Sequence, residues 1–316
     1  MKLIESKAEF LPQESGIEGI YKMIEVAGRT AYNSQDKITP DSAKDFVDRM
    51  IKSKHGAALE HGTVYLFYSV SCYDIEGQKL VSKYESNPYS KVIYVGVDDN
   101  EPSKDGNYYD LVGNEACGNE QYIITTNYRA LVENNWLDDL QYLCSPTEFH
   151  EKRYTMRFTC SRAIAQELTR HRVFSFLMES QRYINYSKER HGGEITYIIP
   201  SWMPQKERHI DTFNGWCIMN GEKIYAFFGK AERHYFYLLD SGLQPQQARD
   251  VLPNATKTEL IMTGFASDYR HLFDLRLFGK TGAPHPDMKD LMQKAQKAMQ
   301  EAGIWEDIMK YPSKFE

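Results

Sequence analysis

The order of strand-like and helix-like segments is the feature that most constrains what this chain can fold into. Residues 17–28 and 41–54 are expected to be helices, the second opened by Pro40-Asp41-Ser42. Residues 63–71 (TVYLFYSVS) alternate as a strand rich in aromatic and β-branched side chains. Such segments come in runs and not in strict strand–helix alternation. This order predicts an α+β fold, with an antiparallel or mixed sheet flanked by helices.

Residues 72–150 interrupt this order, which then continues in the second half of the chain. Within the interruption we expect a strand over 91–95, a polar loop over 98–107 and a helix near 125–143. Beyond it, a strand over 154–160 is expected to run directly into a helix over 161–168. The remaining expected elements are short strands over 182–187 and 194–200, a long helix over 212–241, a strand within 252–262, and amphipathic helices over 265–277 and 284–302.

The charge balance restricts what the chain can bind. It has 316 residues, with 38 Lys and Arg against 44 Asp and Glu, so its net charge is −6. An acidic overall balance argues against a protein that coats nucleic acid. An anionic ligand therefore requires a local cluster of cations. The length allows one large domain or two ordinary ones, and a hydrophobic fraction of 41% excludes a disordered chain.

The cysteines and the apolar runs bear on the compartment. The five cysteines are scattered and form no CxxC pair, which disfavours a disulfide framework, a zinc ribbon and a redox motif. No apolar run reaches the roughly 18 residues that a membrane span requires, and residues 1–7 lack the apolar core of a secretory signal. We therefore expect a cytoplasmic protein with no membrane partner.

The densest run of chemically active side chains lies at residues 170–183 (RHRVFSFLMESQRY). Its cationic or titratable groups include Arg170, His171, Arg172 and Arg182, Ser180 supplies a hydroxyl eight positions after Arg172, and the aromatic residues among them are Phe174, Phe176 and Tyr183. Guanidinium groups bind phosphate with paired, charge-assisted hydrogen bonds. The run therefore suits a phosphorylated aromatic ligand. The simpler alternative is a solvated basic turn paired with nearby carboxylates.

A second group of titratable residues lies upstream, at residues 55–61 (HGAALEH). His55, Glu60 and His61 invite comparison with zinc-dependent hydrolases. Their spacing differs, however, from both the HExxH and the HxxEH motif. A metal-dependent hydrolase that uses these three residues is one alternative function. An RNA- or nucleotide-binding module that uses the basic run is another.

Further cations follow toward the C-terminus. Arg249 comes shortly before Pro253, which stops a helix, and His271 and Arg276 fall within the helix expected over 265–277. The last two are five residues apart, about 140° around a helix, so they need not face the same ligand atoms. Each of these residues, taken alone, is compatible with a structural role.

Taken together, these segments resemble the flavin-dependent thymidylate synthase family. Its signature, RHR followed by seven residues and Ser, is met by residues 170–172 and Ser180. The supporting segments come in the family's order: His55, Glu60 and His61 before a strand, Ser161-Arg162 before the signature, Ala248-Arg249 and Leu252-Pro253 after it, and a helix that ends in Leu275-Arg276. The resemblance covers most of the chain. It implies a single domain over 1–316 with a family-variable insertion, about 72–150, in the first strand pair.

The resemblance implies a reaction as well as a fold. Members of the family transfer the methylene group of methylenetetrahydrofolate to C5 of dUMP. Reduced FAD supplies the hydride and NADPH reduces the flavin, without a catalytic cysteine. The members are homotetramers, which is the assembly that the resemblance implies here.

The resemblance also assigns roles to individual residues. The implied FAD contacts are His55, Glu60, Arg170, His171, Arg172, Val173 and His271. The implied dUMP contacts are Glu167, Arg170, Met178, Glu179, Ser180, Gln181, Arg182, Arg249 and Arg276. Arg276 and Ser180 are the expected catalytic residues, Arg276 because a guanidinium fixed beside the uracil stabilises the charge that develops on N3 and the C4 carbonyl. No metal ligand is expected.

The chain departs from the family pattern at several positions. Ala57 stands where a Ser or Thr is common near the flavin phosphate, Leu177-Met178 where many members have Asn-Glu, and Phe265 where an Asn often contacts FAD. A variant activity on the same fold, such as the (hydroxy)methylation of a pyrimidine nucleotide, is therefore an alternative to dTMP synthesis.

Overall fold

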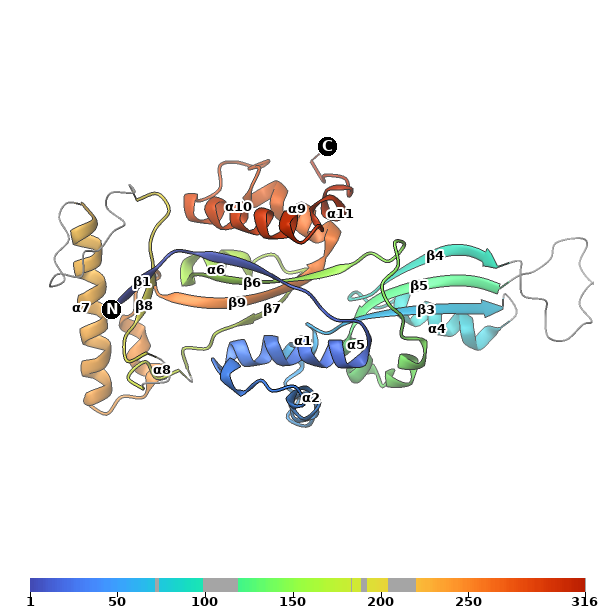
Figure 1. Ribbon diagram of the computed structural model, residues 1–316, viewed down its shortest axis with the longest axis horizontal. Coiled ribbons are helices and arrows are strands. Elements are labelled where there is room, and N and C mark those ends of the chain that lie inside the picture. The colour runs from blue at the N-terminus through green and yellow to red at the C-terminus, as the bar shows by residue number, and fades with distance from the viewer. Residues whose placement is uncertain (72–73, 99–118, 183, 189–191, 204–219, 316) are drawn as a thin grey trace, which may run out of the picture. The chain divides into compact units, whose positions relative to one another are not determined.

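The computed structural model describes residues 1–71, 74–98, 119–182, 184–188, 192–203 and 220–315 (Figure 1). Tyr183, most of the polar loop expected over 98–107 and the first part of the helix expected over 212–241 lie outside these residues. The chain divides into two compact units, Met1–Pro12 with Val26–Ile38 and Tyr154–Glu316, and Gln13–Glu25 with Thr39–Arg153. The single domain expected over 1–316 stays a prediction.

The first unit is built on a four-stranded sheet with the strand order β2-β6-β9-β7. The strands are β2 (Lys7–Leu11), β6 (Arg153–Ser161), β9 (Lys257–Phe265) and β7 (Ser175–Met178). β2 is antiparallel to β6, and β7 is antiparallel to β9, with Ser175 opposite Thr263. A separate two-stranded sheet pairs β1 (Lys2–Ile4) with β8 (Thr196–Ile198) in parallel.

The helices that share a core with the four-stranded sheet are α6 (Arg162–Leu168), α9 (Ala266–Arg276), α10 (Pro286–Glu301) and α11 (Trp305–Met309). Helices α7 (Asn220–Asp240) and α8 (Pro245–Ala248) share a second core with β8. Short 3-10 turns lie at η1 (Gln35–Lys37) and η5 (Arg249–Val251). Helices α9, α10 and α11 lie along one face of the sheet (Figure 1). Fully buried Phe158, Met262, Phe273 and Met292 belong to the core that joins these layers. This arrangement confirms an α+β fold with antiparallel strands and flanking helices.

The second unit is built on a three-stranded sheet with the strand order β3-β5-β4. Its strands are β3 (Thr63–Ser71), β5 (Asn119–Asn127) and β4 (Lys91–Asp98), and both pairings are antiparallel. Its helical elements are α2 (Ser42–Lys52), α3 (Gly56–Leu59), α4 (Ile75–Glu85), α5 (Tyr128–Asn134) and η2 (Leu137–Tyr142). Helix α1 (Gly16–Ala31) begins in this unit and ends in the first one.

The strands and helices with the clearest sequence pattern lie where they were predicted. The strand over 63–71 is β3, and the strand-to-helix junction near residue 161 is the β6–α6 junction, where the Ser161 hydroxyl accepts a hydrogen bond from the backbone N–H of Ile164. The strand predicted over 182–187 is wrong for the described residues, because Asn185 forms a turn whose side chain accepts from the Ser187 N–H and hydroxyl. The helix predicted near 125–143 is also wrong as one element. It is divided where Asn135 adopts the left-handed conformation that ends α5.

Two further findings concern membrane-spanning helices and residues 72–150. None of the helices in the described ranges is both long and apolar enough to cross a membrane. Residues 72–150 contribute β4, β5 and α5 to the second unit, and β5 pairs along the whole of β3. The segment that interrupts the sequence pattern therefore completes the sheet that begins with β3.

Candidate functional site

The RHR tripeptide lies in the tight turn that connects helix α6 to strand β7. The backbone N–H of His171 donates to the Leu168 carbonyl at 3.0 Å, and that of Phe174 donates to the His171 carbonyl at 3.2 Å. Arg170 and Arg172 are exposed on this turn, and the apolar Val173 is 63% exposed. The turn thus presents two guanidinium groups and an apolar side chain to solvent.

Phe174 anchors the turn in the core of the first unit. It is buried and packs edge-to-face on Tyr269 of α9, with ring centroids 4.9 Å apart. The ring also lies against Gly264 of β9, where a Cβ atom would come within 2.2 Å of Phe174 Cδ1. A glycine is therefore required at residue 264 if the signature turn is to keep this position.

The histidine of the signature is bonded to the arginine predicted to be catalytic. Arg276 Nε donates to His171 Nε2 at 3.0 Å, and Arg276 Nη1 lies 3.5 Å from Glu167 Oε2. Burial, together with the positive charges of Arg276, His271 and Arg170, lowers the pKa of His171 to about 4. A neutral imidazole can accept the hydrogen bond from Arg276, whereas an imidazolium cannot. We call Glu167, Arg170, His171, His271 and Arg276 the His171 cluster.

His271 belongs to this cluster although it lies five residues from Arg276 on α9. After burial and Arg276, an electrostatic interaction with His271 contributes to the lowered pKa of His171. The His271 ring stacks on Phe315, with centroids 5.6 Å apart. Among the described residues, the buried Nδ1 of His271 has no hydrogen-bond partner. Such an atom is costly to bury, and a bound ligand is one way to satisfy it.

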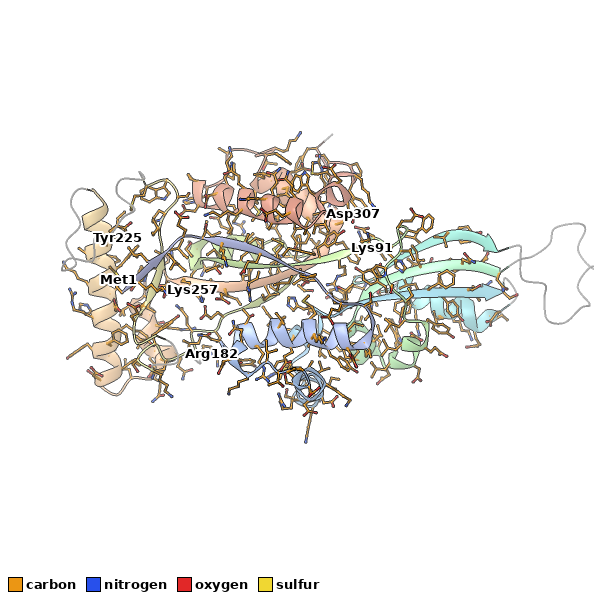
Figure 2. The ribbon with its side chains drawn as sticks, viewed as in Figure 1. Met1, Lys91, Arg182, Tyr225, Lys257 and Asp307 are labelled. Carbon is orange, nitrogen blue, oxygen red and sulfur yellow. The ribbon has the colours of Figure 1, made fainter. Side chains whose placement is uncertain are left out.

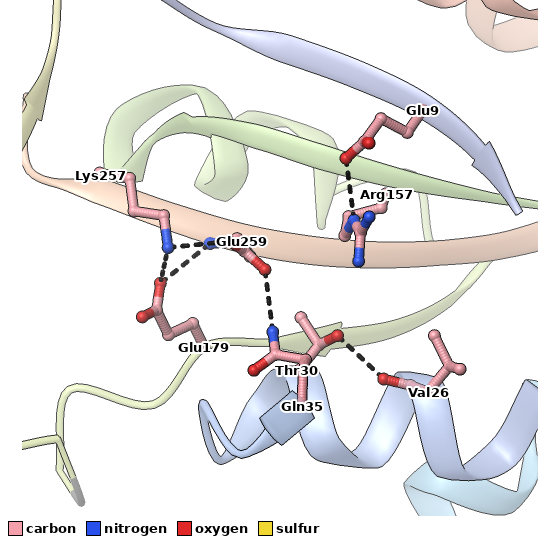
Figure 3. Close-up of polar contacts among 8 residues, drawn as sticks. All are labelled: Glu9, Val26, Thr30, Gln35, Arg157, Glu179, Lys257 and Glu259. Carbon is pink, nitrogen blue, oxygen red and sulfur yellow. Dashed lines mark hydrogen bonds and ion pairs between the residues drawn. The ribbon is translucent and has the colours of Figure 1, made fainter. Parts of the chain in front are cut away.

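Glu179, a predicted dUMP contact, is held in a buried network (Figure 3). Lys257 Nζ lies 3.1 Å from Glu179 Oε2 and 3.0 Å from Glu259 Oε1. The Glu259 N–H donates to Glu179 Oε2 at 3.2 Å, and the Glu179 N–H donates to the Glu259 carbonyl at 2.8 Å. Burial raises the pKa of Glu179, and Lys257 opposes that rise. This carboxylate therefore braces the loop after β7, and its contact with dUMP stays a prediction.

The residues after Glu179 form the loop in which the other dUMP contacts were predicted. The Ser180 N–H donates to the Ala31 carbonyl at 3.0 Å, and the Arg182 N–H donates to Ser180 Oγ at 3.4 Å. Gln181 is buried, and its Nε2 has no hydrogen-bond partner within the described ranges. Arg182 is exposed at the surface (Figure 2), and Met178 is half-buried on β7.

Arg162 is a candidate site residue to which the sequence assigned no role. It is half-buried at the first position of α6, and its Nη1 is buried without a partner among the residues described. Burial lowers the pKa of Arg162; Tyr186 and Glu179 oppose that change, and the positive charge of Arg249 adds to it. Two guanidinium groups that repel each other favour an anion between or beside them. The sequence signal was present, because an Arg follows the capping Ser161 directly.

His55 and Glu60 belong to the second unit. His55 immediately precedes α3, and Glu60 Oε1 accepts a hydrogen bond of 2.5 Å from Arg129 Nη1. His61 is fully buried, and burial together with Arg153 lowers its pKa to about 3. No three His, Cys, Asp or Glu side chains of the described chain lie close enough to hold a metal ion. The metal-dependent hydrolase alternative therefore has no ligand set at His55, Glu60 and His61.

Comparison with known proteins places these residues in a family context. A family model described as "Thymidylate synthase complementing protein" matches residues 116–302, more than half of the chain. The flavin-dependent thymidylate synthase of Pyrococcus furiosus is 33% identical over 118 residues, which are 37% of this chain and 43% of that protein. That of Geobacter sulfurreducens is 32% identical over 116 residues, 37% of this chain and 44% of that protein.

These matches are partial in length. The chain spans less than half of the two relatives just named. A solved structure of a UMP/dUMP methylase from Streptomyces cacaoi bound with 5-Br dUMP aligns with 98% of this chain and 97% of its own, at 14% identity and a TM-score of 0.41. The family match rests on the sequence that carries the signature turn, the Glu179 loop and helix α9. The chain belongs to the thymidylate synthase complementing protein family.

Proposed function

We propose that this chain is a flavin-dependent thymidylate synthase, which makes dTMP from dUMP with methylenetetrahydrofolate as carbon donor and NADPH-reduced FAD as hydride donor. The observation that carries the proposal is the pairing of Arg276 with His171 of the RHR signature and with Glu167. Family membership supports it, as do the printed names of the relatives. The proposal makes dUMP the substrate and FAD the resident cofactor.

The donor set of the first unit fits anionic, nucleotide-sized ligands. The guanidinium groups predicted from the sequence for this site are Arg170, Arg172, Arg182, Arg249 and Arg276, and the structure adds Arg162. Three buried nitrogen atoms lack a partner among the described residues: Arg162 Nη1, Gln181 Nε2 and His271 Nδ1. Phosphate and uracil oxygens are acceptors that such groups bind well. The residues present therefore fit both dUMP and a flavin nucleotide.

Arg276 is proposed to stabilise the charge that develops on the substrate. The flavin, when bound and reduced, supplies the hydride. As negative charge grows on N3 and the C4 carbonyl of the uracil, a guanidinium that is already oriented stabilises it without reorganisation. His171 and Glu167 provide that orientation, since each holds a different nitrogen of Arg276. Neutral His171 acts as a hydrogen-bond acceptor in this arrangement.

The phosphate of dUMP is proposed to bind near Arg249, with Arg162 and Arg182 contributing. The buried, unpartnered Nη1 of Arg162 supports this assignment, as does the lowering of the pKa of Arg162 by burial and by the positive charge of Arg249. Ser180 and Gln181 are proposed to hold the nucleotide from the loop that Lys257 and Glu179 brace. Arg170, His171, Arg172, Val173 and His271 are proposed to contact FAD. Within the second unit, His55 and Glu60 are proposed FAD contacts. We extend the proposal to a homotetramer, as in the family.

A second candidate function keeps the same site but changes the substrate or the group transferred. Met178 stands where many family members have a Glu, and it is half-buried on β7 beside the proposed nucleotide loop. This position favours keeping (hydroxy)methylation of a pyrimidine nucleotide as the alternative. Identification of the nucleotide product by mass spectrometry separates the two functions.

Flavin binding tests the proposal without requiring turnover. The purified protein is expected to be yellow, or to become so and to quench flavin fluorescence when FAD is added. A folded but colourless protein that also fails to bind added FAD would contradict the proposal. If the activity of the purified protein survives treatment with a metal chelator, the alternative of a metal-dependent hydrolase is excluded as well.

A further inference from the structure

We propose that Arg129 of helix α5 is a positioning residue that holds the Glu60 carboxylate in place for the flavin. The inference rests on the proposed function, in which Glu60 lines the flavin pocket. Arg129 lies within residues 72–150, the segment expected to be a family-variable insertion. It therefore gives that segment a part in the proposed cofactor site.

The contact between Arg129 and Glu60 is short and is made by one oxygen only. Arg129 Nη1 donates to Glu60 Oε1 at 2.5 Å, and Arg129 Nε donates to Glu133 Oε1 at 2.7 Å. The guanidinium is thus fixed from two sides, by a residue of its own helix and by Glu60, which lies 69 positions away in the sequence. Within the described ranges, no donor bonds to Glu60 Oε2, which stays available to accept a hydrogen bond from a ligand hydroxyl or N–H.

The residue beside His55 makes room for this guanidinium. A Cβ atom on Gly56 would lie 2.8 Å from Arg129 Nε and 3.1 Å from its Cζ, closer than such atoms pack. Any larger side chain at Gly56 must therefore displace Arg129 from its place across α3. Gly56 therefore leaves the space in which the Arg129 guanidinium and the Glu133 carboxylate lie.

The backbone around Arg129 is fixed relative to Glu60 as well. The Tyr128 N–H donates to the Gly62 carbonyl at 2.8 Å, which ties the start of α5 to the turn just after Glu60. The Asn127 side chain caps α5 by accepting from the Ala130 N–H at 3.0 Å. Arg129 lies between these two anchored residues. Its side chain therefore reaches Glu60 from a rigid helix start, which is the condition for positioning a ligand-binding carboxylate.

The test compares FAD dissociation constants of single and double variants, measured by fluorescence titration of the flavin-free full-length chain. Arg129→Gln is expected to weaken FAD binding about tenfold, and Arg129→Lys to restore part of that loss. Lys44→Gln breaks an exposed ion pair with Asp48 in the same unit, makes no contact with Arg129 or Glu60, and serves as the matched control, with a change of less than about twofold. Gly56→Ala is an independent perturbation, expected to weaken FAD binding by displacing Arg129.

A double-mutant cycle separates positioning from a general structural effect. Glu60→Gln combined with Arg129→Gln is expected to weaken FAD binding no more than the stronger single variant, because both act through one contact. Additive losses, or an Arg129→Gln variant that binds FAD as the wild type does, would overturn the inference. If the wild type itself binds no FAD, the proposed function fails instead. Thermal unfolding midpoints of all variants identify any that are not folded.

Discussion

Arg276 on helix α9 donates a hydrogen bond of 3.0 Å to Nε2 of His171, 105 residues earlier in the chain. The bond joins the last residue of a helix to the middle of the signature turn, and it requires the imidazole to be neutral. Glu167 on α6 takes a second nitrogen of the same guanidinium. The orientation of Arg276 is therefore set by His171 in the signature turn and by Glu167 in the preceding helix α6.

Replacing Arg276 is expected to impair turnover more than nucleotide binding. Arg276→Gln should lower kcat by about 100-fold or more, since an oriented charge-stabilising donor is lost. It should also raise the pKa of His171 from about 4 toward the ordinary value, because the nearest cation is removed. Steady-state kinetics and histidine NMR titration measure the two effects. The exposed Arg233 of α7, changed to Gln, is the control, and unchanged turnover in Arg276→Gln would refute the catalytic role.

Acid is expected to destabilise the protein below pH about 6.5. The pKa values of His171 and His61 are lowered to about 4 and about 3, so the unfolded chain takes up these protons before the folded chain does. Stability is therefore fully present above pH about 6.5 and is lost as the pH falls toward these values, by up to about 1.4 kcal/mol per pH unit for each histidine. Urea unfolding at several pH values measures the slope. His171→Gln should reduce it, whereas the same change at the exposed His234 should leave it as it is.

The buried pair of Lys257 and Glu179 is expected to be critical for stability. Lys257→Met leaves the Glu179 carboxylate buried without its cation and should lower the free energy of unfolding by about 3–5 kcal/mol. A double variant that combines Lys257→Met with Glu179→Leu should recover much of the lost free energy of unfolding, because the buried Glu179 charge is removed as well. Lys44→Met, which breaks an exposed pair with Asp48, should cost less than about 1 kcal/mol. Equal losses for the two lysines in urea unfolding would contradict the network.

Arg162 and Arg249 are expected to share one anionic ligand. Arg162→Gln and Arg249→Gln should each weaken dUMP binding by about tenfold or more, since each loses a charge-assisted hydrogen bond. Isothermal titration with dUMP measures the affinity, and deoxyuridine, which lacks the phosphate, provides the comparison. The loss should disappear with deoxyuridine. An equal loss with both ligands would assign the two arginines to another part of the nucleotide.

Much of the fold could be predicted from the local sequence pattern. The parts that could not be predicted depend on single residues or on partners far away in the sequence. Strand β3 shows regular alternation, and the β6–α6 junction has its capping Ser161, so both were predicted closely. Asn135 and Asn185 each adopt turn conformations that interrupt otherwise regular segments, and such residues are easily taken as parts of the neighbouring element.

The site was predictable in its residue types but not in its pairings. The RHR signature indicated His171, and the end of helix α9 indicated Arg276, but their bond depends on the packing of α9 against β9. Lys257 and Arg129 belong to no motif, and their partners, Glu179 and Glu60, lie 78 and 69 positions away. Contacts over such distances follow from the tertiary fold alone, so sequence periodicity does not show them.

The release of tritium from dUMP labelled at C5 tests the central claim most directly. The FAD-loaded chain is incubated with this nucleotide, with and without methylenetetrahydrofolate and NADPH, and the nucleotide product is identified by mass spectrometry. For a flavin-dependent thymidylate synthase, tritium release and a product with the mass of dTMP are expected to require the folate and NADPH together. A folded, FAD-loaded protein that releases no tritium and forms no methylated nucleotide would contradict it.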